Sequence, residues 1–157
     1  MVKPKEQDND NKPSTCSPRT LTAVGLTVIC TTADSRSQIE QLSPASFAYI
    51  GDAVYELYIR THYLLPPRRI CAYHDQVVAQ VRAETQASHL RSLSPYLTDE
   101  EKEILRRGRN AANGGPRRLS PEVYQKATSL ETLIGYLYLK NPQRLNQLLG
   151  LLELNKI

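Results

Sequence analysis

The sequence predicts an all-α fold, and three observations lead to that prediction. Apolar residues recur every three or four positions in four stretches, which is the period of a helix with a buried face. Two of these stretches begin with Ser-Pro, and serine is a good N-cap while proline suits the first helical position. Residues 37–157 contain no run that alternates between apolar and polar residues, so we predict no strand there. The predicted helical stretches are residues 43–60, 72–93, 120–140 and 143–154.

The length and composition favour one domain with an N-terminal tail. A chain of 157 residues with 40% hydrophobic content can bury one sizeable core. Residues 1–36 mix charged residues with Pro, Ser, Thr and Asn without a sustained period, so we expect a mostly disordered tail. Residues 21–30, LTAVGLTVIC, are β-branched, but a single strand without a partner is unstable, so we interpret them as irregular. The predicted folded domain covers residues 37–157.

The helix predicted over residues 43–60 carries the first candidate functional group. Its apolar residues form two strips, so most of this helix should be buried. Asp52 borders one strip and follows Gly51, and a glycine inside a helix, which costs about 1 kcal/mol relative to alanine, suggests that another backbone approaches closely. An ionised carboxylate at the edge of a core needs a partner or a metal.

The middle of the chain predicts two helices and a basic loop. A long helix is expected over residues 72–93, after the break at Pro66 and Pro67. Thr98 and Glu101 have the spacing of a capping box, and the short helix that they start should end at Arg107. Residues 108–119, GRNAANGGPRRL, contain three glycines and a proline and predict a mobile loop.

The helix predicted over residues 120–140 repeats the pairing of an acid with a glycine. Glu131 lies among apolar neighbours, and Gly135 lies four positions later on the same face. If the faces marked by Gly51 and Gly135 pack together, Asp52 and Glu131 converge and offer carboxylate oxygens to Mg²⁺. A metal held there would make a bound water nucleophilic and neutralise charge on a phosphodiester. The alternative is that each acid is an ordinary exposed residue of its helix.

A basic segment between the two acids is a candidate phosphate-binding surface. From residue 106 to residue 118 there are five arginines and no acid, and arginine forks suit phosphate oxygens. Nothing in the segment specifies bases. The alternative is a solvated surface turn. The predicted RNA-binding residues are Arg106, Arg107, Arg109, Asn110, Arg117 and Arg118.

Charge, cysteine usage and hydropathy narrow the class of protein. Twenty Lys and Arg against sixteen Asp and Glu give a formal charge of +4, a mild bias that is compatible with a polyanionic partner. Three widely spaced cysteines without a C-x-x-C motif indicate neither a disulfide framework nor a zinc site. No apolar run is long enough to span a bilayer, and the acidic N-terminus fits no signal peptide. We therefore expect a soluble cytoplasmic protein that does not bind a membrane.

Two segments of the sequence resemble the ribonuclease III endonuclease domain. YIGDAVYELY, residues 49–58, is similar to the signature FLGDAVL, and KATSLETLIGYLYL, residues 126–139, is similar to a later helix that reads close to LEALIGAIYL. With LRRGRNA at 105–111 between them and no double-stranded-RNA-binding domain afterwards, the chain resembles the Mini-III branch of that family. The resemblance covers residues 40–152.

The resemblance implies an activity and assigns roles to the two acids. Asp52 matches the metal-linked aspartate of the signature helix, and Glu131 matches the catalytic metal-binding glutamate. Acids of the larger enzymes align with Ala45, Ala48 and Thr128, so the carboxylate set is reduced, as in Mini-III enzymes.

By resemblance, we expect a Mg²⁺-dependent, homodimeric endoribonuclease that cleaves double-stranded RNA and matures the 23S ribosomal RNA precursor. Ribosomal proteins or the pre-ribosome are the further partners suggested. The competing class is a non-catalytic RNA-binding or ribosome-associated protein with the same fold, and the retention of both acids favours the enzyme. A hydrolase of small phosphate esters is disfavoured, because the arginine segment is too broad for a small pocket.

Overall fold

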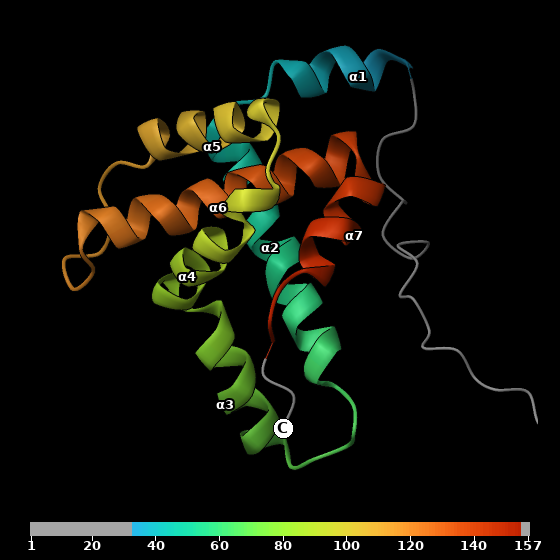
Figure 1. Ribbon diagram of the computed structural model, residues 1–157, viewed down its shortest axis with the longest axis vertical. Helices are drawn as coiled ribbons and strands as arrows, with labels where there is room; N and C mark the ends of the chain where they lie inside the picture. Colours follow the sequence, from blue (N-terminus) through green and yellow to red (C-terminus); the bar gives the residue numbers. More distant parts are fainter. Residues whose placement is uncertain (1–32, 155–157) are drawn as a thin grey trace, which may run out of the picture.

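The computed structural model describes residues 33–154, and side chains from residue 37 onward. Over this range the protein contains helices and turns and no strand, which confirms the predicted all-α fold (Figure 1). The elements are α1 (Ala33–Glu40), α2 (Pro44–Tyr63), α3 (Ile70–Val81), α4 (Ala83–Leu93), the short 3-10 helix η2 (Ser94–Tyr96), α5 (Asp99–Ala111), α6 (Pro121–Lys140) and α7 (Pro142–Gly150). The stretch at 21–30 and most of the predicted tail lie outside the described residues.

Local capping fixes where the main helices begin. The Ser43 hydroxyl accepts a hydrogen bond from the Ser46 amide at 3.1 Å, and the Ser120 hydroxyl accepts one from the Val123 amide at 3.3 Å. α5 has the predicted capping box, in which Thr98 and the side chain of residue 101 satisfy each other's backbone amides. These bonds satisfy donors that the first turn of a helix leaves unpaired. The predicted starts of α2, α5 and α6 are therefore confirmed.

The two longest helices, α2 and α6, cross at the centre of the molecule (Figure 1), and their backbones are in contact there. A Cβ placed on Gly51 would lie 1.8 Å from the Glu131 carbonyl oxygen, and one on Gly135 would lie 2.0 Å from the Phe47 carbonyl oxygen. No side chain fits at either position. The two glycines therefore permit a helix approach that any other residue would prevent.

The core forms around this crossing. Tyr55 and Ile59 of α2 are fully buried, and Leu130 and Leu133 of α6 are each only 1% exposed. Phe47 and Val54 of α2 are also buried, at 7% exposed each, whereas Tyr49 and Leu57 remain 88% and 45% exposed. Most of the apolar surface of α2 is therefore buried, and the side of the helix with Tyr49 and Leu57 stays open.

The prediction of one continuous helix over residues 72–93 is wrong, because the helix is broken at Arg82. Arg82 has an extended backbone (φ −65°, ψ 146°) that ends α3 and precedes α4. Two side chains of α4 stabilise the break: Thr85 Oγ1 donates to the Ala79 carbonyl at 2.8 Å, and Gln86 Nε2 donates to the Val81 carbonyl at 3.3 Å. They satisfy carbonyls that the end of α3 would otherwise leave without partners.

Two other predicted boundaries are also corrected. α5 continues to Ala111, so residues 108–111 are helical and not part of the loop. The reason is close packing: a Cβ on Gly108 would lie 2.5 Å from Thr132 Oγ1, so this glycine brings α5 against α6. The final helix ends at Gly150, four residues before its predicted end, although Leu152 and Leu154 remain buried beyond it.

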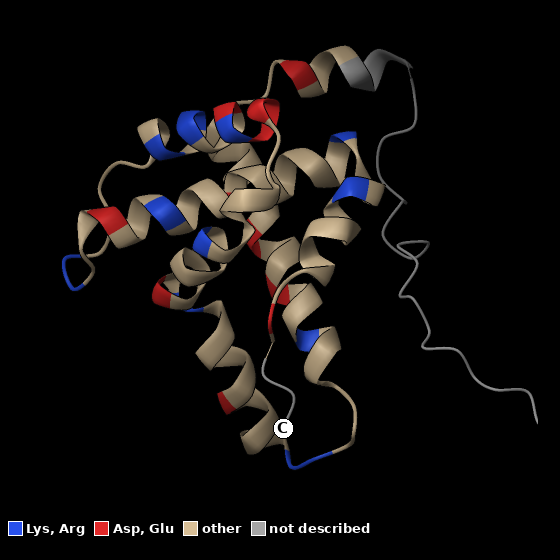
Figure 2. Ribbon diagram, in the orientation of Figure 1, with Lys and Arg blue, Asp and Glu red and all other residues tan. Residues whose placement is uncertain are grey.

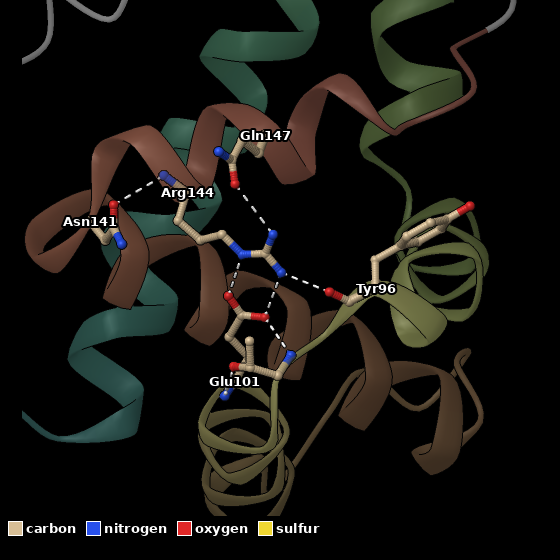
Figure 3. Close-up of polar contacts among 6 residues, drawn as sticks. Tyr96, Glu101, Asn141, Arg144 and Gln147 are labelled. Carbon is tan, nitrogen blue, oxygen red and sulfur yellow. Dashed lines mark hydrogen bonds and ion pairs between the residues drawn. The ribbon is translucent and has the colours of Figure 1, made fainter.

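Polar links hold the end of the bundle where α6 meets α7. Figure 3 shows Arg144 of α7 paired with Glu101 of α5, with Nε to Oε1 at 2.7 Å and Nη2 to Oε2 at 3.0 Å. Arg144 Nη2 also donates to the Tyr96 carbonyl at 2.7 Å. Only 4% of Glu101 is exposed, and its hydrogen bond to Arg144 lowers the pKa of the carboxyl. Four residues before Arg144, Lys140 Nζ donates to the Glu40 carboxylate at 2.8 Å and so ties α1 to α6.

We predict that Gly51→Ala destabilises the protein by about 3 kcal/mol or more, because the added methyl group meets rigid backbone. Alanine should gain back only about 1 kcal/mol through its helix propensity. Gly150→Ala is the matched control, since a Cβ there has no atom within 4 Å. Urea denaturation of both variants measures the difference. Equal stability would show that α2 and α6 do not cross on Gly51.

Candidate active site

Asp52 and Glu131 flank the crossing of α2 and α6. Asp52 follows Gly51, whose Cα lies against the backbone of Glu131 itself. The predicted packing of the two glycine-marked faces is therefore confirmed, and the two carboxylates are close enough for the charge on Asp52 to perturb Glu131. Figure 2 shows acidic positions on α2 near the middle of the molecule. Asp52 is exposed, whereas Glu131 is partly buried.

The electrostatics of the pair are unfavourable in the absence of a cation. Burial, and then the charge on Asp52, raise the pKa of Glu131 to about 7 from an ordinary value of 4.5, although a hydrogen bond from Gln86 opposes the change. Burial and the charge on Glu56 raise the pKa of Asp52. Both shifts disfavour the ionised form, and among the described residues neither acid forms an ion pair with Lys, Arg or His. A cation between them would remove that cost.

The donor set fits a hard divalent cation. Carboxylate oxygens are ligands that Mg²⁺ prefers, and Mg²⁺ commonly keeps several waters while binding one or two carboxylates. Within residues 33–154 no group of three or more His, Cys, Asp or Glu is arranged to hold a metal ion. Asp52 and Glu131 would therefore hold the ion with waters in the remaining positions.

Sequence reasoning missed a buried polar group behind the acids. Gln86 and His89 of α4 are 2% and 7% exposed, and Tyr55 of α2 is fully buried. Tyr55 Oη lies 2.7 Å from His89 Nδ1, and burial lowers the pKa of His89. The break at Arg82 turns these α4 residues inward. Because the sequence predicted one unbroken helix here, their burial was not expected. The only available signal was the run of polar residues that follows Val81.

Among the described residues, no ion pair joins the predicted RNA-binding arginines to the two acids. Arg106 is on α5 and forms two 2.7 Å bonds with Glu103, and the loop that holds Arg117 and Arg118 ends at the start of α6. Glu131 lies ten residues further along α6, roughly 15 Å at the helical rise. In Figure 2 the basic positions on α5 and in the following loop lie toward the N-terminal end of α6.

Comparison with known proteins identifies the family. A model of the ribonuclease III domain matches residues 45–142, which include both acids. The chain belongs to the ribonuclease III family. As a member, it is an endoribonuclease. The ribonuclease III match ends at the first residue of α7 and so takes in the whole α2–α6 crossing.

The similar proteins place the chain in the Mini-ribonuclease 3 branch. Mini-ribonuclease 3 of Synechocystis sp. is 60% identical over 74% of this chain and 81% of its own length. The protein of that name from Clostridium tetani is 37% identical, over 74% of this chain and 80% of its own length. A crystal structure of a Fusobacterium nucleatum protein is 32% identical, with a TM-score of 0.65, and the match covers 70% of this chain and 91% of that one.

We predict that Glu131→Gln stabilises the metal-free protein at pH 8. The raised pKa means that ionised Glu131 destabilises the fold above about pH 7, and that this cost shrinks as pH falls toward 4.5, where the unfolded carboxyl also takes up its proton. Allowing for partial solvent exposure, the gain should reach about 2 kcal/mol at pH 8 and be smaller at pH 5.

Thermal melts in EDTA at the two pH values measure this effect. A variant that is less stable than wild type at pH 8 would mean that Glu131 has a compensating positive partner.

Proposed function

We propose that this ribonuclease III protein cleaves double-stranded RNA with Mg²⁺ held between Asp52 and Glu131. The observation that supports the proposal is the contact of α2 with α6, which sets two carboxylates with raised pKa side by side. Ribonuclease III proteins are generally metal-dependent. A pair of acids that lacks a cationic partner is the arrangement that a divalent ion would complete.

The two acids have different surroundings, which suits different tasks. Glu131 is partly buried and fixed on the inner side of α6, so its carboxylate is well placed to set the position of the ion. Asp52 is exposed on α2 and borders the surface that an RNA backbone would approach. When bound, Mg²⁺ would supply a water of lowered pKa and neutralise charge on the phosphate.

We further propose that the protein acts as a homodimer through the open side of α2. Tyr49 is 88% exposed and Leu57 is 45% exposed, and Ala53 between them is also exposed. Their spacing of four residues puts them on one helix face. Large exposed apolar residues that share a face are typical of an interaction surface. Asp52 lies beside this face, so a second subunit would extend the surface that an RNA duplex covers.

The predicted arginine residues are proposed to hold the RNA away from the cleavage point. Arg109, Arg117 and Arg118 are exposed, and none has an ion pair in the described part of the chain. Arg106 is held by Glu103, so it would have to exchange a carboxylate for a phosphate. Arg107 and Asn110 are on the same exposed part of α5. An RNA duplex carries phosphates along its whole length, so one duplex would contact both this arginine segment and the surface beside the two acids.

The proposed substrate is the double-stranded part of a 23S ribosomal RNA precursor, in the cytoplasm and with ribosomal proteins or the pre-ribosome as further partners. The similarity to Mini-ribonuclease 3 proteins supports this choice. None of the helices in residues 33–154 has the length and apolar character of a bilayer-spanning segment.

We predict that Asp52→Asn or Glu131→Gln reduces cleavage of double-stranded RNA more than about 100-fold, because groups that only support metal ligands already contribute about 10- to 100-fold. Glu122→Gln is the matched control, since it removes an exposed acid of α6 that is paired with Lys126. Cleavage of double-stranded and single-stranded RNA with Mg²⁺ and with EDTA is the assay. Full activity of either acid variant would refute the proposed site.

We predict that the combined Arg109, Arg117 and Arg118 to alanine variant binds double-stranded RNA more weakly at every sequence, with an unchanged melting temperature. The slope of log K against log salt should fall by about 0.9 for each phosphate that the variant no longer neutralises, as for B-form duplexes. Lys102→Ala on the first half of α5 is the control for removing one positive charge of that helix outside the segment. Binding as tight as wild type at several salt concentrations would make this segment a solvated surface.

A further inference from the structure

The loop that joins α5 to α6, residues 112–120, carries Arg117 and Arg118 and has little packing to hold it in one shape (Figure 1). Every residue from 113 to 118 is exposed except Gly115, which is half-buried. A cavity of about 420 Å³ lies between this loop and the start of α6. The contacts of Gly115 therefore decide how the middle of the loop is held.

Hydrogen bonds do not fix this loop to α6. Its backbone bonds are short-range: the Asn113 amide donates to the Ala111 carbonyl at 3.0 Å, and the Leu119 amide donates to the Pro116 carbonyl at 3.0 Å. Among the described residues, no side-chain hydrogen bond or ion pair links residues 113–119 to α6. A packing contact must hold the loop instead.

That contact is made by the ring of Tyr124, which lies one turn into α6. A Cβ built on Gly115 would be 2.6 Å from both Cγ and Cδ1 of Tyr124 and 3.1 Å from its Cβ. Only a residue without a side chain can approach the ring this closely. These atoms are at the base of the tyrosine side chain, so a small movement of the ring's tip would not make room. The Tyr124 hydroxyl forms no hydrogen bond with the described residues, so the ring makes the contact.

We propose that Tyr124 is a positioning residue that holds the α5–α6 loop in the shape in which its arginines bind RNA. This inference rests on the RNA-binding role proposed above for Arg117 and Arg118. A loop without support loses backbone freedom when it binds, and that loss weakens binding. A loop that already rests on the ring has lost part of this freedom before RNA arrives.

The role has a signature that separates it from direct phosphate binding. Tyr124 is uncharged and half-buried against Gly115, so it acts through the loop. The number of phosphates neutralised is set by the arginines, and it determines the slope of log K against log salt. Loss of the ring should therefore weaken binding without changing that slope, whereas loss of the arginines lowers it.

The test compares Tyr124→Ala with Tyr124→Phe in the full chain. Phenylalanine keeps the ring and removes only the hydroxyl, whereas alanine removes the ring. Fluorescence anisotropy with a double-stranded RNA in EDTA gives Kd at several salt concentrations, and steady-state cleavage with Mg²⁺ gives kcat and KM. Melting temperatures report on folding.

Tyr124→Ala should raise Kd and KM about 10-fold, which is roughly the cost of ordering one further residue on binding. Its kcat at saturating RNA and its salt slope should stay at the wild-type values. Tyr124→Phe should match wild type in each of these quantities. Equal Kd for the alanine and phenylalanine variants, or a shallower salt slope for Tyr124→Ala, would overturn the inference.

A second arm approaches the contact from the loop and keeps the test decisive if Tyr124→Ala folds poorly. Gly115→Ala leaves α6 unchanged and pushes a methyl group against the ring, so it should also raise Kd about 10-fold with an unchanged salt slope. If both substitutions act through this contact, the double variant binds no more weakly than the weaker single variant, whereas independent effects multiply. Wild-type Kd for Gly115→Ala, or a multiplied effect in the double variant, would contradict the proposed role.

The combined Arg109, Arg117 and Arg118 to alanine variant separates this inference from the proposed function. If that variant binds RNA as tightly as wild type, the RNA-binding role of the arginines fails and the role of Tyr124 fails with it. If it binds weakly while Tyr124→Ala and Gly115→Ala bind as tightly as wild type, only the role of Tyr124 is removed.

Discussion

The backbone contact between α2 and α6 at Gly51 and Gly135 is the constraint on which the rest of the structure depends. A Cβ on these glycines would lie only 1.8 Å and 2.0 Å from a carbonyl oxygen of the other helix. Two glycines inside helices cost about 1 kcal/mol each in propensity, which the burial of residues such as Ile59 and Leu133 at the crossing offsets. α4 and α5 also pack against α6.

The crossing also places two acids where their ionised forms are unfavourable. It sets Asp52 and Glu131 side by side, and the burial that stabilises the helices raises the pKa of both acids. Stability and activity therefore oppose each other at this point. A divalent cation would relieve the repulsion.

The sequence predicted the features that depend on local chemistry. Ser43, Ser120 and Thr98 begin their helices as expected, and a glycine near an acid on two helices was enough to predict their convergence. The resemblance assigned the family. These signals are readable because a cap or a close helix approach restricts residue type at the position itself.

The features that depend on distant contacts were not readable. The break at Arg82 requires side chains of α4 to bond carbonyls of α3, and the helical pattern of residues 72–93 carries no mark of it. Gln86 acquires its buried position only after the break has turned α4, so its burial could not be predicted from spacing.

A metal site at the α2–α6 crossing is tested most directly by anomalous diffraction from crystals of the full chain grown with Mn²⁺. We expect one anomalous peak between α2 and α6, within coordination distance of carboxylate oxygens of both Asp52 and Glu131. A Mn²⁺ ion bound elsewhere, with both of these carboxylates free of metal, would contradict the proposed site.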